Sequence, residues 1–300
     1  MTRKNRNLLV FGLVWFAILT LLSFGLYLPY MKAYGLVHPG RSAPDRFPQS
    51  DYQNVQFTTS DGLVLKGWYV PPRNGALVIF VDGLNGNRTE LLDEADFITA
   101  AGYGALLFDL RNHGESEGNV TTLGLYEVRD VQAAVAFVRR TTGPNLPVAL
   151  FGHSMGGATV LLAADKLPEV RAVIAESAYS SVEDNIAEGV RGLTGLPPFP
   201  FAPLIVFFGE REAGVDIRSV RPLDVVGQIS PRPLLLIHGE LDSLILVENS
   251  RRLYAAAREP KELYILPNVG HGGFLQAAPE EYPRRILVFL EKYLLPAPNK

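Results

Sequence analysis

Residues 148–166 read VALFGHSMGGATVLLAADK, and this stretch decides the fold. It begins with four apolar residues, 148–151, of the kind that form a strand buried on both faces. The next five residues match the pattern G-x-S-x-G, and the alanine-rich segment 156–167 that follows predicts a helix. The stretch therefore predicts a strand, a sharp turn that carries Ser154, and a helix.

The glycines of this turn have a physical reason. Side chains at Gly152 and Gly156 would collide with the backbone where the helix crosses the strand, and the turn holds the Ser154 hydroxyl exposed. The start of the helix directly after Ser154 favours negative charge near it. A G-x-S-x-G match alone is a weak signal, but the strand before it and the helix after it make an ordinary glycine-rich turn the weaker interpretation.

Strand-like and helix-like segments alternate on both sides of this stretch. We expect strands at 55–59, 63–70, 76–81, 104–109, 148–152, 170–175, 234–238 and 262–266, and helices at 89–101, 122–140, 156–167, 247–257 and 281–294. Ser60-Asp61-Gly62 between the first two strands predicts a hairpin. The alternation predicts an α/β fold with a mostly parallel sheet covered by helices, and the hairpin gives it an antiparallel edge.

One segment, residues 182–229, breaks the alternation. An insertion of this length in a compact α/β domain is usually functional, so we predict a lid, with a peripheral helical excursion as the alternative. Apolar side chains of this insertion are predicted to line a substrate pocket or to touch a bilayer: Phe199, Phe201, Leu204, Phe207 and Phe208.

The composition of the 300 residues excludes several classes of protein. A net charge of −3 argues against a basic nucleic-acid surface. The absence of cysteine excludes disulfide scaffolds, thiol nucleophiles, iron–sulfur clusters and cysteine zinc sites. The sequence has no H-E-x-x-H motif, no paired histidines at ligand spacing and no G-x-G-x-x-G after a strand, so we expect no metal and no cofactor.

The N-terminal 32 residues differ from the rest of the chain. Residues 8–28 form an uncharged run of 21 residues, preceded by Arg3, Lys4 and Arg6. As a helix, this run is about 30 Å long, the thickness of a bilayer core. We predict a membrane anchor at 1–32 with one transmembrane helix, a linker at 33–50 and a catalytic domain at 51–300.

The basic residues before the run predict a cytoplasmic N-terminus, and therefore a membrane protein whose domain lies on the extracytoplasmic side. A cleaved signal peptide and a buried core helix are the alternatives. The apolar run is longer than the roughly 7–15 residues of a signal peptide, and Leu28-Pro29-Tyr30-Met31 is a poor cleavage site.

Over about residues 51–294 the chain resembles the α/β-hydrolases of the esterase, lipase and prolyl-oligopeptidase-like kind. Five segments carry the resemblance in the order typical of that family: VDGLNGN at 81–87, FDLRNHGES at 108–116, GHSMGG at 152–157, HGELD at 238–242 and GHG at 270–272.

The resemblance implies a catalytic triad. Ser154 is then the nucleophile, His271 the base, and Asp242 the acid that orients the imidazole. Glu240 is the alternative acid, and Asp224 and Asp82 are more remote ones. The other histidines are interpreted as non-catalytic: His38, His113, His153 and His238.

The resemblance also implies an oxyanion hole, formed by the main-chain N–H groups of Met155 and Leu84. Family members often carry His-Gly where this chain has Asp82-Gly83, a departure that affects the bonding inside the loop. Asp109 and Arg111 are interpreted as a structural pair beside the site.

These features predict a membrane-anchored serine hydrolase that cleaves esters through an acyl-enzyme intermediate. The expected partners are a small-molecule or lipid acyl substrate and a membrane, with no nucleic acid. The alternatives are a peptidase, thioesterase or acyltransferase with the same triad, and a catalytically silent, membrane-tethered binding protein.

Overall fold

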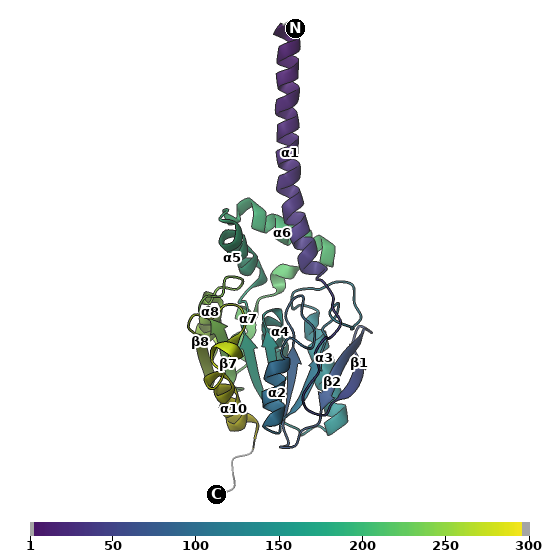
Figure 1. Ribbon diagram of the computed structural model, residues 1–300, viewed down its shortest axis with the longest axis vertical. Coiled ribbons are helices and arrows are strands. Elements are labelled where there is room, and N and C mark those ends of the chain that lie inside the picture. The colour runs from purple at the N-terminus through teal and green to yellow at the C-terminus, as the bar shows by residue number, and fades with distance from the viewer. Residues whose placement is uncertain (1–2, 296–300) are drawn as a thin grey trace.

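The computed structural model describes residues 3–295, without the side chains of residues 3, 17, 18, 21, 22 and 24. The sheet at its centre has eight strands in the order β1-β2-β4-β3-β5-β6-β7-β8 (Figure 1). The strands are β1 Gln53–Thr58, β2 Val64–Val70, β3 Leu77–Val81, β4 Gly104–Phe108, β5 Val148–His153, β6 Ala172–Glu176, β7 Leu234–Gly239 and β8 Lys261–Leu266.

The sheet is mostly parallel, as predicted. The β1–β2 and β2–β4 pairs are antiparallel, and every pair from β4 to β8 is parallel. All residues of β3, β4, β5, β6 and β7 are buried, because helices cover both faces of the sheet. The expected hairpin forms the antiparallel edge.

The helices divide between the two faces. Side chains of α3 (Glu127–Thr142), α4 (Met155–Asp165) and α8 (Glu248–Ala256) join the core cluster on one face. Side chains of α2 (Leu92–Ala100), α9 (Phe274–Ala277) and α10 (Glu281–Leu294) join the cluster on the other. The residues of β3 alternate between these clusters, with Ile79 in the first and Phe80 in the second.

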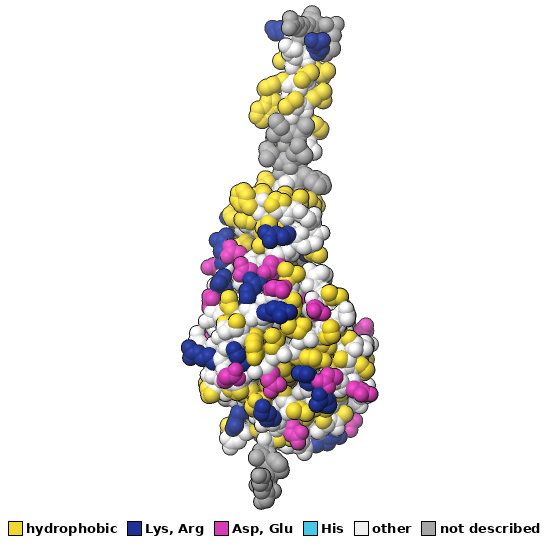
Figure 2. All heavy atoms as spheres, turned by 90° about the vertical axis from the view of Figure 1, so that its left-hand side faces the viewer, with side chains coloured by type: hydrophobic (Ala, Val, Ile, Leu, Met, Phe, Trp, Pro, Cys, Tyr) yellow, Lys and Arg dark blue, Asp and Glu magenta, His cyan; other side chains and the backbone are white. Residues whose placement is uncertain are grey.

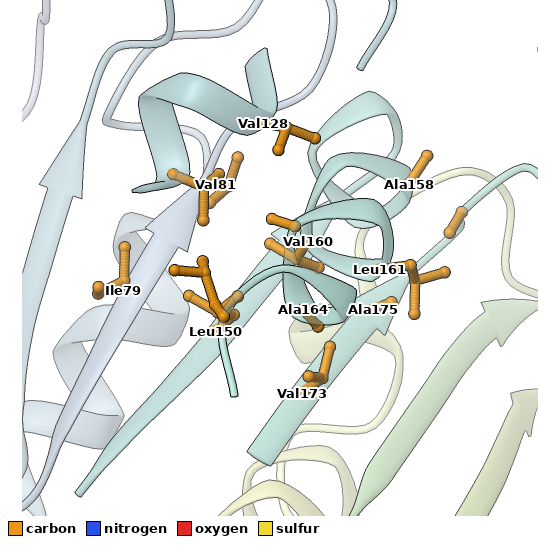
Figure 3. Close-up of a cluster of buried hydrophobic side chains, with 14 of the residues drawn as sticks. Ile79, Val81, Val128, Leu150, Ala158, Val160, Leu161, Ala164, Val173 and Ala175 are labelled. Carbon is orange, nitrogen blue, oxygen red and sulfur yellow. The ribbon is translucent and has the colours of Figure 1, made fainter. Parts of the chain in front are cut away.

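Helix α4 packs most closely on the sheet. Figure 3 shows Val160, Leu161 and Ala164 of α4 among side chains of β3, β5 and β6. A Cβ on Gly156, in the first turn of this helix, would lie 2.1 Å from the carbonyl oxygen of Val81. The backbone of α4 therefore touches the end of β3 directly, and only glycine fits at the contact.

The insertion between β6 and β7 contains two long helices, α5 (Val182–Thr194) and α6 (Pro198–Ala213). The Ser181 side chain caps α5 by accepting the N–H of Asp184, and Gly195 ends this helix in the left-handed conformation. Three short helices return the chain to the sheet: η1 Ile217–Ser219, α7 Pro222–Val225 and η2 Val226–Gln228. Figure 1 shows α5 and α6 beside the base of the N-terminal helix.

The N-terminal helix α1 (Arg3–Val37) projects far beyond the domain (Figure 1). It ends five residues beyond the predicted anchor, and Pro29 lies inside it. Past Pro29 the helix is packed: Ala33 forms a buried cluster with Val190 of α5 and Ile205 of α6.

The described side chains of α1 before Pro29 are exposed and largely apolar, and Figure 2 shows hydrophobic side chains along this part of the helix. Among the residues that the structure describes, no helix is sufficiently long and apolar to cross a membrane. The predicted transmembrane helix at 8–28 is not shown by the structure and stays a prediction. Part of that segment, the side chains of residues 17, 18, 21, 22 and 24, lies outside the described residues.

We expect Gly156→Ala to lower the free energy of unfolding by about 3 kcal/mol or more, because the new methyl group would overlap main-chain atoms of β3 that cannot move aside. Gly192→Ala is the control, since Gly192 is exposed in α5 with open space around it. It should instead stabilise the helix by up to about 1 kcal/mol. Urea unfolding measures both, and equal stability of the two variants would contradict the packing argument.

Candidate active site

Three side chains predicted from the sequence lie in hydrogen-bond contact. The Nε2 atom of His271 is 2.9 Å from the Oγ atom of Ser154, and its Nδ1 atom is 2.7 Å from Oδ2 of Asp242. Ser154 follows β5, Asp242 follows β7 and His271 follows β8, so all three lie at the carboxyl ends of parallel strands. A hydroxyl, an imidazole and a carboxylate in this order are arranged for proton transfer from the hydroxyl.

The backbone of Ser154 is held in an uncommon conformation, with φ 56° and ψ −119°. A residue with a side chain adopts positive φ only where its surroundings enforce it. Here the N–H group of Ser154 donates to the carbonyl of Glu176 at 2.8 Å, and α4 begins at the next residue. The sharp turn directs the Ser154 hydroxyl away from the sheet and toward His271.

The Asp242 carboxylate is buried and fully bonded. The N–H groups of Leu244 and Ile245 each donate to Oδ1 at 2.9 Å, and Nε2 of His238 lies 3.3 Å from Oδ2. Burial by itself raises the pKa of Asp242, but hydrogen bonds from His238 and His271 outweigh it and hold that pKa well below the ordinary 3.8. The group is therefore ionised at neutral pH and available to an imidazolium at His271.

The alternative acids lie elsewhere. Glu240 is exposed, Asp224 pairs with Arg221 at 3.0 Å, and Asp82 lies 2.9 Å from Nδ1 of His113. The Asp82–His113 contact joins the loop after β3 to the loop after β4. The sequence departs from the family pattern by having Asp82-Gly83 in place of His-Gly. The contact with His113 gives the buried Asp82 carboxylate a bonding partner within these loops.

Asp109 and Arg111 do not pair with each other, so the predicted pairing is wrong. The two residues are buried and bonded to different partners. Asp109 binds Arg88 at 2.9 Å, and Arg111 binds Asp130 at 2.7 Å. Two side chains that follow β4 thus hold different segments, since Asp109 binds the loop after β3 and Arg111 binds helix α3. Which partner each takes depends on residues distant in the chain.

The two residues predicted as oxyanion donors, Leu84 and Met155, lie near Ser154. Leu84 and Met155 line the same cavity as Ser154 and His271. Met155 is the first residue of α4, so its N–H group belongs to the helix turn that has no acceptor within the helix. The N-terminal end of α4 has a positive electrostatic potential, and main-chain N–H groups are available there. Both would stabilise an oxyanion as it forms.

Glu90 is a site residue that the sequence analysis missed. Its carboxylate accepts the N–H of Gly83, and a Cβ on Gly86 would lie 2.5 Å from its Oε2 atom, so the carboxylate fills the turn that carries Leu84. Glu90 faces the cavity, yet the surrounding protein desolvates it enough to raise its pKa. In the sequence it resembles any acidic residue at the start of the predicted helix 89–101.

His153, the variable residue of the motif, lies behind the site. Its ring centroid is 5.0 Å from that of His271, and its Nδ1 atom is 3.7 Å from a carboxylate oxygen of Glu176. Burial lowers the pKa of His153 to about 4, so the ring is neutral at pH 7. Behind it the Tyr282 hydroxyl contacts Glu176 and Glu94, and burial raises the pKa of both carboxyl groups.

A largely apolar cavity of about 610 Å³ opens from Ser154, a volume within the range of about 300–1,000 Å³ typical of ligand pockets. Of the five predicted pocket residues, Phe201 lines it. The others lie outside its lining: Phe199 and Phe207 are exposed, Leu204 is half-buried, and Phe208 packs on Tyr30 of α1. Within the described residues, no group of three His, Asp or Glu side chains is placed to hold a metal ion.

A serine, a histidine and a carboxylate joined in this order at the ends of parallel strands define the class of serine α/β hydrolases. The comparisons agree with this class. A model of the serine aminopeptidase S33 family matches residues 72–201. YqkD of Bacillus subtilis is 29% identical over 84% of this chain and 83% of its own length.

YfhR of Escherichia coli is 30% identical over 73% of this chain and 73% of its own length. An esterase of Pyrococcus furiosus, Pf2001, superposes with a TM-score of 0.73 and 26% identity, covering 86% of this chain and 98% of that one. The chain belongs to the α/β-hydrolase superfamily, in the same family as YfhR.

We expect Glu90→Ala to lower kcat on p-nitrophenyl butyrate by about 10-fold, because the loop that carries Leu84 loses the acceptor of the Gly83 N–H. This loss is smaller than the roughly 10²–10³-fold effect of removing an oxyanion donor itself. Glu90→Gln keeps an oxygen acceptor and should retain most of the activity, with KM little changed in both variants. Steady-state kinetics on p-nitrophenyl butyrate provide the test, and wild-type kcat in Glu90→Ala would exclude this positioning role.

Proposed function

We propose that the protein is a serine hydrolase that cleaves esters with apolar acyl groups, with Ser154, His271 and Asp242 as its catalytic triad. The observation that carries the proposal is the position of His271, which is 2.9 Å from Ser154 Oγ and 2.7 Å from Asp242 Oδ2 at one end of an apolar cavity.

The contacts support a two-step reaction. As Ser154 Oγ attacks the ester carbon, its proton passes to Nε2 of His271, and the ionised Asp242 stabilises the imidazolium. The oxyanion accepts the N–H groups of Leu84 and Met155. Collapse of the tetrahedral intermediate expels the alcohol, which takes the proton from His271. A water molecule, deprotonated by the same imidazole, then releases the acid and frees Ser154.

The charges around the cavity favour an ester over a peptide with a free amino terminus. An α-ammonium group needs an acidic partner, and Glu90 is the only acidic residue among the described residues that line the cavity. Its carboxylate already accepts the Gly83 N–H, whereas Lys32 adds positive charge to the lining. An uncharged acyl chain suits this surface better. The same triad can also cleave thioesters or transfer acyl groups. Kinetic measurements on substrates of each kind distinguish these reactions.

We expect the full-length protein in detergent to react with a fluorophosphonate probe, and Ser154→Ala to give no labelling, because Oγ is the attacking atom. Asp242→Asn should lower kcat by about 10⁴-fold, since the imidazole loses its partner. The second measurement is hydrolysis of p-nitrophenyl esters of increasing chain length. An unlabelled wild type would identify a silent binding protein, and labelling with a flat ester panel would indicate amides or thioesters.

We further propose that the first part of α1 attaches the domain to a membrane, with its N-terminus in the cytoplasm and the domain outside. The exposed apolar side chains before Pro29 and the basic residues at the start of the helix support this proposal. In this arrangement α5 and α6 form a lid over the cavity on the side of the domain that faces the lipid.

We expect the full-length protein to stay in the membrane pellet after alkaline carbonate extraction. Charges at two exposed apolar positions, Phe11→Glu with Leu19→Glu, should release it, because buried carboxylates are costly in lipid. The control, Gln53→Glu with Thr58→Glu, puts the same charge on the exposed edge strand β1 and should remain in the pellet. Protease added to intact spheroplasts should digest the domain. A wild type found in the supernatant, or a fully protected domain, would refute the attachment or its orientation.

A further inference from the structure

The N-terminal helix contributes directly to the cavity that contains the nucleophile. Four residues of α1 line it, namely Leu28, Pro29, Lys32 and Leu36. Leu28, Lys32 and Leu36 are spaced by four residues, so they lie on one face of the helix, one turn above another. The lining of the catalytic cavity thus includes a segment that, in the sequence, precedes the hydrolase-like region.

The base of α1 is fixed in this place by contacts of several kinds. The buried Ala33 packs with Val190 and Ile205 of the lid helices, and the Tyr30 ring stands edge-on to Phe208 at 5.6 Å. After the last turn, Nε2 of His38 lies 2.9 Å from a carboxylate oxygen of Glu212 in α6.

The end of α1 is also bonded to the catalytic domain. The carbonyl of Val37 accepts the N–H of Thr121 at 2.8 Å and the side-chain amide of Asn112 at 3.3 Å. Because the helix is held by the lid and by the loop after β4 together, its face toward the cavity is a structural wall.

The rim of the cavity is apolar where it meets this helix. Three leucines line the cavity and are also about half exposed: Leu28 on α1 at 51%, Leu193 on α5 at 57% and Leu196 at 45%. The exposed Leu26 and Tyr27 continue the apolar surface up α1, and Phe199 and Phe207 extend it over α6. Figure 2 shows hydrophobic side chains gathered around the base of α1.

We propose that α1 is part of the substrate-binding site and that the substrate is an acyl ester taken from a lipid surface, with its acyl chain held against Leu28, Leu36 and the lid helices. This inference rests on the proposed function and names its substrate class. A lipid surface is the occupant that matches the rim, because the exposed apolar side chains of Leu26 and Tyr27 extend it along α1, away from the domain.

Lys32 fits the same arrangement. It is exposed beside the rim, where its alkyl stem can cover the apolar lining while the ammonium group remains among polar groups of the lipid surface. A cation at this place attracts anionic lipid head groups.

The first test measures chain-length selectivity. Leu28→Trp and Leu36→Trp narrow the cavity, so the ratio of kcat/KM for p-nitrophenyl laurate to that for the butyrate should fall by about 10-fold or more. Leu36→Ala widens the cavity and should raise the ratio. The matched control is Met31→Trp, which puts the same side chain at an exposed position of α1 that does not line the cavity.

Fluorophosphonate labelling identifies the variants that keep a folded site. If labelled Leu28→Trp, Leu36→Trp and Leu36→Ala all have the selectivity of Met31→Trp, α1 is no part of the binding site, although the proposed function stands. If the wild type neither labels nor hydrolyses any ester, both proposals fail.

The second test asks where the substrate comes from. The rate on a long-chain ester in phosphatidylcholine vesicles, divided by the rate on dissolved p-nitrophenyl butyrate, should fall several-fold in Phe199→Ser with Phe207→Ser. Adding the anionic lipid phosphatidylglycerol to the vesicles should raise this ratio for the wild type. The increase should be smaller for Lys32→Glu, which lacks the cation that attracts anionic head groups. Wild-type ratios in both variants would overturn entry from a lipid surface.

Discussion

The site depends on a contact between two pieces of main chain. The first turn of α4 approaches the end of β3 so closely that a methyl group at Gly156 would lie 2.1 Å from the Val81 carbonyl oxygen. The same approach holds Ser154 at positive φ, between the last residue of β5 and the first of α4. It also brings the loop after β3, which carries Leu84, beside Ser154. A side chain at the contact would push α4 off β3 and so separate Ser154 from Leu84, the proposed oxyanion donor on the loop after β3, even if Ser154, His271 and Asp242 kept their contacts.

Around this contact the buried charged side chains form separate groups, and the members of each group bond to one another or to nearby main chain. Asp242 is bonded to two histidines and two main-chain N–H groups, so it stays ionised in a buried position. Asp82 with His113 and Asp109 with Arg88 tie the loops after β3 and β4 together behind the nucleophile. Because burial of an unpaired charge is costly, these pairs hold the loops in one arrangement.

Much of the fold could be predicted from the sequence because its signals are local. The 152–156 motif, the strand before it and the helix after it are neighbours in the chain, and apolar runs mark the other strands. The acid and the base were assigned from the resemblance to the α/β-hydrolases and its chain order. Glu90 was missed, because its role depends on Gly83 and Gly86 folding back onto it. The partners of Asp109 and Arg111 were missed for a similar reason, since no spacing in the sequence distinguishes Arg88 from Arg111 as the partner of Asp109.

The prediction for the N-terminal helix used the uncharged, apolar run at residues 8–28. That run gives no information on the last turns of α1, which end at Val37. Those turns form one side of the cavity that Ser154 and His271 line. A chain shortened to begin after residue 37, as is common when an apolar N-terminus hampers purification, would therefore lack part of its own cavity wall. Its substrate preferences would be those of a wider, more open site, and they would misrepresent the selectivity of the whole protein.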